Sequence, residues 1–150
     1  MGMRLLSGTT GRAGIDEERR RNRFDAYFPR VFAYVQHCAG DETATREMVT
    51  EAFARAFARA GKLGEEDFRL ALFGAARDLM NLIRGPSLRE GLTVRERDLV
   101  ALLFDGLLDQ REVARLLSIS DEAVTAELVV ALKKLRAGKG TLSVPSFLRA

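Results

Sequence analysis

Very few side chains in this sequence could carry out covalent chemistry or bind a metal. The chain has one cysteine, Cys38, and one histidine, His37, which are neighbours in an apolar stretch. A nucleophilic cysteine needs a suitably placed base, and a zinc site needs several Cys or His ligands. Neither a glycine-rich phosphate loop nor a pair of catalytic acids is visible. We therefore expect Cys38 to be a core thiol, and we expect no enzyme activity, no metal and no cofactor.

The remaining polar groups could act by binding rather than by catalysis. The net charge of +3 is small, so the placement of charge matters more than its sum. Arginines at positions 19, 20, 21 and 23 form a basic cluster. This cluster is either a solvated first turn of a helix or a phosphate-contacting patch. Between residues 91 and 137, in contrast, acidic residues slightly outnumber basic ones.

Length and composition indicate a globular protein. The chain has 150 residues, 47% hydrophobic and 30% charged, enough for one ordinary domain or two small ones. No apolar run approaches the ~18–20 residues of a membrane span, and the N-terminus lacks the apolar core of a signal peptide. We expect a cytoplasmic protein with no membrane partner. Residues 1–15 are expected to be a disordered leader, and residues 138–150 a tail that is frayed or docked through its Phe147-Leu148 pair.

The segment from Leu92 to about residue 137 has the strongest helical pattern. Thr93 with Glu96 three residues later is a capping box, and leucines then recur at helical spacing. Gly106 is expected to end this helix, and Asp109 can cap the next one. Ser118-Ile119-Ser120 is typical of a tight turn between crossed helices, and the final helix follows. This pattern predicts either a helix-turn-helix, whose second helix enters DNA, or a plain helical hairpin.

The N-terminal part predicts a small bundle of three helices. Their expected bounds are about 16–39, 42–60 and 68–84, with Asp41 and Asp67 as caps of the second and third. Pro29 lies inside the first helix and would mark a kink or a restart, because it removes an internal hydrogen bond.

The run LTVRERDLVALLF…EVARLLSIS…LVVALKKLR resembles the promoter-reading C-terminal domain of extracytoplasmic-function sigma factors of bacterial RNA polymerase. FDAYFPRVFAYV, TREMVTEAFARAF and FRLALFGAARDLMNLIR resemble helices of the N-terminal core domain of the same family. The resemblance, that of a divergent member, implies an all-α fold with two small domains. These are a sigma region 2-like bundle (16–84) and a sigma region 4-like helix-turn-helix (92–137), joined by a short linker (85–91).

The resemblance also implies three binding surfaces. The reader helix would meet the upstream promoter element through Ser120, Asp121, Glu122, Thr125, Ala126, Leu128 and Lys133. The downstream element would meet Phe73, Arg77, Asn81 and Arg84, although Phe73 could equally be a core residue. Core RNA polymerase would dock on Glu47, Thr50, Glu51 and Arg55, which share one helix face. That face could also be an ordinary solvated one.

The chain departs from the family at several of these positions. Ala71 replaces the usual Trp of the downstream reader, and Asp78 replaces an Asn. The start of the reader helix has Thr125, Ala126 and Glu127 where Lys, Ser and Arg are usual, and acidic groups there repel phosphates. We therefore expect weak binding of promoter DNA.

Two functions remain open on this evidence. The first is a transcription-initiation factor that binds core polymerase and promoter DNA. The second is a degenerate sigma-like interaction module that binds an anti-sigma factor or another regulator with little or no DNA binding. The short linker favours the second, because seven extended residues span at most about 25 Å. The two promoter elements lie more than one DNA turn apart, which is upwards of ~34 Å. The length of the resemblance favours the first, and the first is the function that we expect of this chain.

Overall fold

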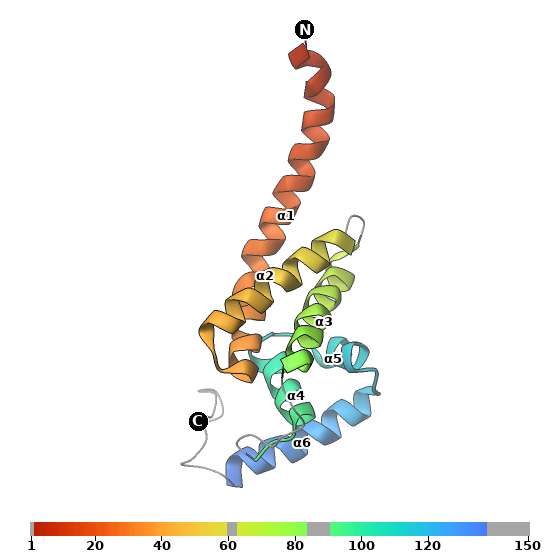
Figure 1. Ribbon diagram of the computed structural model, residues 1–150. Helices are drawn as coiled ribbons and strands as arrows, with labels where there is room; N and C mark the ends of the chain where they lie inside the picture. Colours follow the sequence, from red (N-terminus) through yellow and green to blue (C-terminus); the bar gives the residue numbers. More distant parts are fainter. Residues whose placement is uncertain (1, 60–62, 84–90, 138–150) are drawn as a thin grey trace.

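The computed structural model describes residues 2–59, 63–83 and 91–137, except for the side chains of residues 2–13 and 15. Within these ranges the secondary structure consists of six α-helices, which confirms the expected all-α fold (Figure 1). They are α1 (Gly2–Ala39), α2 (Glu42–Arg59), α3 (Glu65–Ile83), α4 (Val94–Phe104), α5 (Gln110–Leu117) and α6 (Asp121–Ala137). Not one helix in this described part of the chain is long and apolar enough to cross a membrane.

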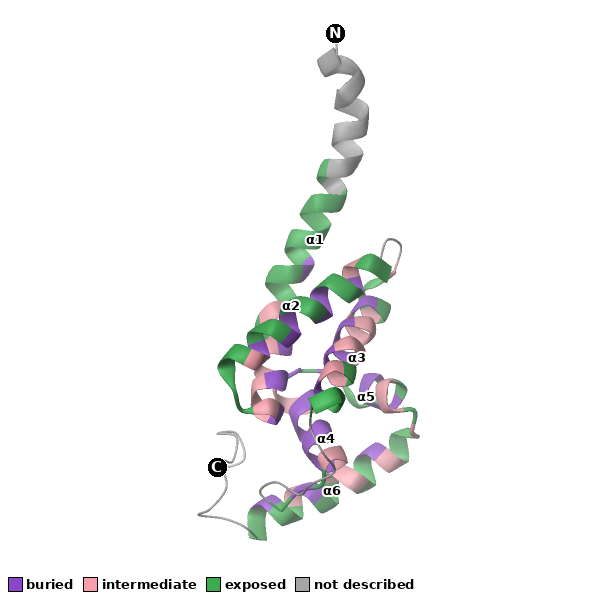
Figure 2. Ribbon diagram, viewed as in Figure 1, coloured by how far each residue is buried: buried purple, intermediate pink, exposed green. Residues whose placement is uncertain are grey.

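Helix α1 is longer than the sequence pattern indicated. We expected a disordered leader over residues 1–15 and a helix from about Asp16, but α1 begins at Gly2 and continues to Ala39. Extending an existing helix costs far less than starting one, so the leader continues the helix that follows it. The first part of α1 projects away from the other helices (Figure 1). Residues 16–22 are all exposed (Figure 2).

Pro29 lies within α1 and does not restart it. The ring of Pro29 deprives the carbonyl of Asp25 of its helical hydrogen bond. Both residues are exposed, so water can take the place of the missing donor. The buried side of the same stretch consists of Tyr27, Val31 and Tyr34, which hold α1 against the bundle.

Helices α2 and α3 form an antiparallel pair beside the second half of α1 (Figure 1). Asp41 caps α2 as expected, since its Oδ2 accepts a hydrogen bond from the Ala44 amide at 2.8 Å. The expectation that Asp67 caps α3 is wrong, because α3 begins at Glu65. Its first turn instead contains three consecutive acidic residues, which interact favourably with the positive end of the helix dipole.

The caps of the last three helices follow the sequence closely. The capping box of Thr93 and Glu96 is present at α4. Asp109 caps α5 with Glu112 as its box partner, a partner that the sequence analysis missed. Ser118 ends α5 with φ of 58° and ψ of 47°, in the left-handed region, and this reverses the chain toward α6.

The turn between α5 and α6 has the apolar centre and the helix caps that the sequence predicted. Ile119 is half-buried and packs against the main core, while the flanking Ser118 and Ser120 are exposed. Ser120 caps α6, because its hydroxyl accepts a hydrogen bond from the Ala123 amide at 3.0 Å. These features confirm the predicted turn.

One hydrophobic core joins the two predicted units. Its buried residues extend from Tyr27 in α1 to Val124 in α6 and include Phe73 of α3 and Leu102 of α4. A smaller cluster under α4 and α6 consists of Leu92, Val100, Ala131 and Leu135. The hydrophobic core is therefore continuous across the domain boundary predicted at residues 85–91. Residues 85–90 themselves lie outside the described ranges.

The turn after α4 offers a direct test of this shared core. A Cβ atom on Gly106 would lie 2.8 Å from the Leu102 carbonyl oxygen and 2.8 Å from Cε1 of Phe73. We expect Gly106→Ala to lower the free energy of unfolding by about 1–3 kcal/mol, because backbone and core ring must both shift. Gly14→Ala is the matched control, since nothing lies within 4 Å of its Cβ. Urea unfolding curves should show no loss for the control, and equal losses in both variants would contradict the packing.

Candidate interaction surfaces

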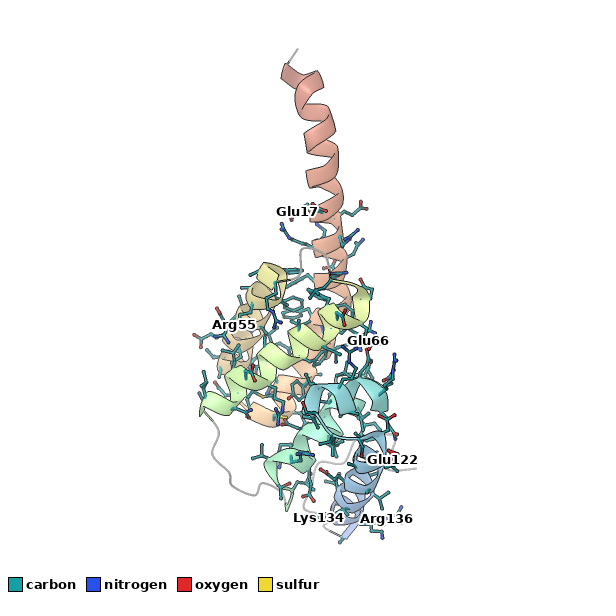
Figure 3. All side chains as sticks on the ribbon, turned by 90° about the vertical axis from the view of Figure 1, so that its right-hand side faces the viewer. Glu17, Arg55, Glu66, Glu122, Lys134 and Arg136 are labelled. Atoms are coloured by element: carbon teal, nitrogen blue, oxygen red, sulfur yellow. The ribbon has the colours of Figure 1, made fainter. Side chains whose placement is uncertain are left out.

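The outer face of α2 contains all four residues predicted to bind polymerase. Glu47, Thr50, Glu51 and Arg55 are exposed, while the opposite side of α2 is buried in the core. Glu51 and Arg55 form an ion pair of 3.1 Å, and Figure 3 shows Arg55 at the outer edge of the molecule. The prediction that these four residues share one exposed face of α2 is therefore confirmed. Its binding partner stays a prediction.

Two of the four residues predicted to meet the downstream element, Phe73 and Arg77, are engaged within the protein. Phe73 is fully buried and packs on Tyr34 with ring centroids 5.7 Å apart, so it cannot stack on a base in this conformation. The alternative prediction, that Phe73 is a core residue, is confirmed. Asn81 is exposed near the end of α3, and Arg84 lies outside the described residues.

Arg77 is held inside the protein by a carboxylate of α4. Its Nε lies 3.0 Å from Oδ2 of Asp98, whose side chain is 0% exposed, and the Arg77 side chain is itself only 27% exposed. Asp98 also accepts a hydrogen bond from the Tyr34 hydroxyl at 3.1 Å, and the Cys38 thiol lies 3.8 Å from the same oxygen. Arg77 is thus a structural cross-link between α3 and α4 in this conformation, and its contact with DNA stays a prediction. The predicted core position of Cys38 is confirmed.

A second polar cluster joins α1, α3 and α5. Arg69 of α3 donates to the nearly buried Glu112 of α5 at 2.8 Å and to the Tyr27 hydroxyl at 3.0 Å. Tyr27 in turn donates to Glu65 at 2.5 Å, and Arg23 donates to Glu65 at 2.9 Å. The hydrogen bond from Tyr27, together with Arg23, lowers the pKa of Glu65 despite partial burial. These contacts hold α5 against the N-terminal bundle.

The acidic first turn of α3 also binds α5. Arg111 donates to Glu66 at 2.7 Å, and Arg115 pairs with both Glu66 and Asp67. Figure 3 shows Glu66 on the side of α3 that meets α5. The hydrogen bonds that Arg115 donates to Glu66 and Asp67 raise the pKa of its guanidinium. Four of the charges in this part of the chain are thereby used within the molecule.

Further polar contacts tie the end of α4 to α1. Arg30 donates to the carbonyl oxygens of Gly106 at 2.8 Å and Leu107 at 3.0 Å. His37 Nδ1 lies 2.5 Å from Oδ2 of Asp105. An apolar stripe was predicted for this part of α1, and neither contact was expected. Arg30, Tyr34 and His37 recur at helical spacing, and that polar line was the available signal.

The outer face of α6 contains most of the residues predicted to read DNA. Ser120, Asp121, Glu122, Thr125, Ala126 and Lys133 are exposed, whereas Leu128 is half-buried. Ser120 serves as the cap of the helix. The Thr125 hydroxyl lies 3.2 Å from Gln110 Oε1 of α5, within the helix-turn-helix. The predicted reader face is therefore accessible, with the exception of Leu128.

Two charges of α6 point toward α4 rather than outward. Glu127 pairs with Arg95 at 3.1 Å, and Lys134 donates to the two carboxylate oxygens of Glu96 at 2.8 and 2.9 Å. Glu127 was counted among the groups that would repel DNA, but its charge is compensated within the protein. The outward charges that remain are Asp121 and Glu122 at the start of α6, with Lys133 and Arg136 near its end.

A groove of about 430 Å³ lies between α2 and α3. It is lined by Arg55, Ala58, Arg59, Leu70, Ala71, Gly74, Ala75 and Asp78. Ala71 and Asp78 are two of the positions at which the chain departs from the sigma pattern. The small side chain of Ala71 leaves space here that a Trp would fill. The groove adjoins the outer face of α2 through Arg55.

Comparisons with protein-family models, with curated proteins and with solved structures found no match. Among the residues that the structure describes, no three Cys, His, Asp or Glu side chains are grouped as metal ligands would be. The candidate sites are therefore the outer faces of α2 and α6, together with the groove beside α2.

The Arg77–Asp98 pair gives a prediction about stability. Asp98→Asn keeps the shape of the side chain but leaves the Arg77 charge without its partner, and we expect a loss of about 3 kcal/mol in the free energy of unfolding. The double variant with Arg77→Met should recover part of that loss. Glu51→Gln, which breaks an exposed pair, should cost less than about 0.5 kcal/mol. Chemical denaturation of the natural protein, of these three variants and of Arg77→Met alone measures these differences and completes the double-mutant cycle. A negligible coupling energy between Arg77 and Asp98 would contradict the assigned cross-link.

The Glu96–Lys134 pair gives a prediction about pH. Burial raises the pKa of Glu96, but the hydrogen bonds from Lys134 and from the Thr93 backbone outweigh it, so the pKa is lowered. A lowered pKa in the folded state means that the stabilisation is present above the unfolded pKa, about 4.3, and is lost as pH falls through the folded value.

Glu96→Gln isolates this charge, because Gln also completes a capping box. The variant should be less stable than the natural protein at pH 7, and the difference should shrink as the pH drops below about 4. Lys134→Met should show the same pH profile. Unfolding curves recorded from pH 7 to 3 measure it, and a difference that is constant across this range would refute the assignment.

Proposed function

We propose that this protein is a sigma-like interaction module of transcription initiation. It binds core RNA polymerase or an anti-sigma factor through the outer face of α2, and it has little affinity for promoter DNA. Such a protein works in the cytoplasm, without an enzymatic activity of its own. This proposal rests on the sequence resemblance and on the arrangement of the side chains that the resemblance singles out.

The ion pair of Arg77 with the buried Asp98 is the observation that favours the module over a DNA reader. Arg77 is the cation best placed for phosphates of the downstream element, and it is engaged inside the protein. Phe73, the aromatic residue of the same surface, belongs to the core. The start of α6 presents Asp121 and Glu122, which repel phosphates. On α2, in contrast, all four residues predicted to bind polymerase are exposed.

The second candidate is the initiation factor that reads promoter DNA. The exposed outer face of α6 behind a well-formed turn favours it, since this is how a reader helix is presented to a major groove. Promoter-dependent transcription with purified core polymerase, together with salt-sensitive binding of duplex DNA, would support this candidate. Tight capture of polymerase or of an anti-sigma factor without DNA binding supports the module. Failure to bind either protein would overturn both.

A pair of charge reversals on α2 tests the proposed docking face. Glu51→Arg should weaken binding of core polymerase or of the anti-sigma factor about ten-fold or more, because it reverses a charge at the centre of that face. Glu42→Arg is the control. It makes the same charge change and breaks a similar i,i+4 ion pair, Glu42–Arg46 in place of Glu51–Arg55. Glu42 lies about two and a half turns away, on the other side of the helix. Equal affinities of the two variants would exclude this face.

A further inference from the structure

The outer face of α6 is divided into three zones along its length. Its start is acidic, with Asp121 and Glu122, its middle is apolar, and its end is basic, with Lys133 and Arg136. Figure 3 shows Glu122 and Arg136 at opposite ends of the helix. We call this face the outer stripe of α6, made of Asp121, Glu122, Ala126, Val129, Val130, Lys133 and Arg136.

The apolar middle of the outer stripe is not needed for the fold. Val129 and Val130 are 45% and 46% exposed, and the neighbouring Ala126 is exposed as well. The core side of α6 is already supplied by Val124, Ala131 and two leucines. Adjacent exposed valines in the middle of a helix leave apolar area in water that a partner could cover. Val129 and Val130 thus mark a contact face.

The charges at the two ends are free to take part in such a contact. Lys133 and Arg136 pair with no residue that the structure describes, and the same holds for the carboxylates of Asp121 and Glu122. Acidic residues at the start of a helix and basic residues at its end also suit the helix dipole, and this accounts for their signs. The dipole does not account for the exposed valines between them.

The stripe is complementary to itself when two copies run antiparallel. Glu122 and Lys133 are separated by roughly 16 Å along the helix, and the apolar residues lie midway. In one antiparallel register Glu122 lies opposite Lys133 of a second copy while Ala126 lies opposite Val129. The same pairs recur on the other side of a two-fold axis, as an isologous interface requires. A parallel arrangement would instead place like charges together.

We propose that the outer stripe of α6 binds a second copy of this chain in an antiparallel, two-fold symmetric dimer. The charge complementarity identifies this occupant, since DNA would be repelled by the acidic start of the helix. One pair of helix faces is small compared with the ~1,200–2,000 Å² of a stable interface, so the dimer is weak and reversible. Dimerisation covers the residues predicted to read DNA, and it does not depend on the proposed function.

Charge reversal tests both the contact and its direction. The basic variant combines Asp121→Lys and Glu122→Lys, and the acidic variant combines Lys133→Glu and Arg136→Glu. Each alone has like charges at both ends of the stripe and should be monomeric, whereas a 1:1 mixture should restore the dimer as a heterodimer. Sedimentation from about 10 μM to 1 mM, the range expected for an interface of this size, measures association. Circular dichroism verifies that both variants are helical.

Substitution of the apolar middle gives an independent measurement that does not alter the ends. Val129→Lys should weaken self-association at least about ten-fold, because each dimer would bury two unpaired cations at its centre. Leu82→Lys is the control, since Leu82 is a 78% exposed apolar residue at the end of α3, away from α6. A natural protein that stays monomeric to 1 mM would overturn the proposal. So would a dimer that Val129→Lys leaves intact, or variants that fail to form a heterodimer. Salt-sensitive binding of duplex DNA by the outer stripe in a protein that does not self-associate would assign this face to DNA instead.

Discussion

A fully buried carboxylate holds the two parts of this protein together. Asp98 belongs to α4, yet its partners Arg77 and Tyr34 belong to α3 and α1. A buried charge is tolerated only where other groups compensate it, and removal of one partner exposes the full cost of its desolvation. The position of α4 relative to the first three helices is therefore specified by polar contacts as well as by apolar packing. The Arg69–Glu112 pair fixes α5 in the same way.

The ion pair with Asp98 explains why Arg77, which was predicted to bind DNA, has a structural role. The side chains that could reach phosphates from α3 are used to attach the helix-turn-helix to the bundle. Of the three predicted binding surfaces, those on α2 and α6 are left outside, and they lie on different sides of the molecule (Figure 1). A protein built this way can bind partners on two sides without opening. The use of Arg77 for DNA would require the separation of α3 from α4.

Local signals in the sequence predicted local structure well. The caps at Thr93, Asp109 and Ser120 and the turn around Ile119 were all identified from short patterns, as was the exposed face of α2. The family and its function could not be tested in this way and stay predictions. The role of Arg77 was not predicted, because its partner is in another helix and helical periodicity contains no information about such pairs.

The surroundings of α4 also escaped prediction for a physical reason. A one-sided apolar stripe is expected of a surface helix, but α4 is covered by α1, α5 and α6, and residues 96–102 are all buried. Its polar residues Glu96, Arg97 and Asp98 thus lie inside the protein. The length of α1 was missed because its glycines were taken as signals of disorder, although the helix that follows them can extend backward.

The placement of these partners has a consequence for how the chain matures on the ribosome. When the first three helices emerge from the ribosome, α4 and α5 have not yet been added to the bundle. Arg69 and Arg77 then lie on a surface that these two helices will cover. Their carboxylate partners follow only at Asp98 and Glu112. The nascent bundle therefore completes its polar packing only after α5 has left the exit tunnel, because Arg69 meets Glu112 no earlier.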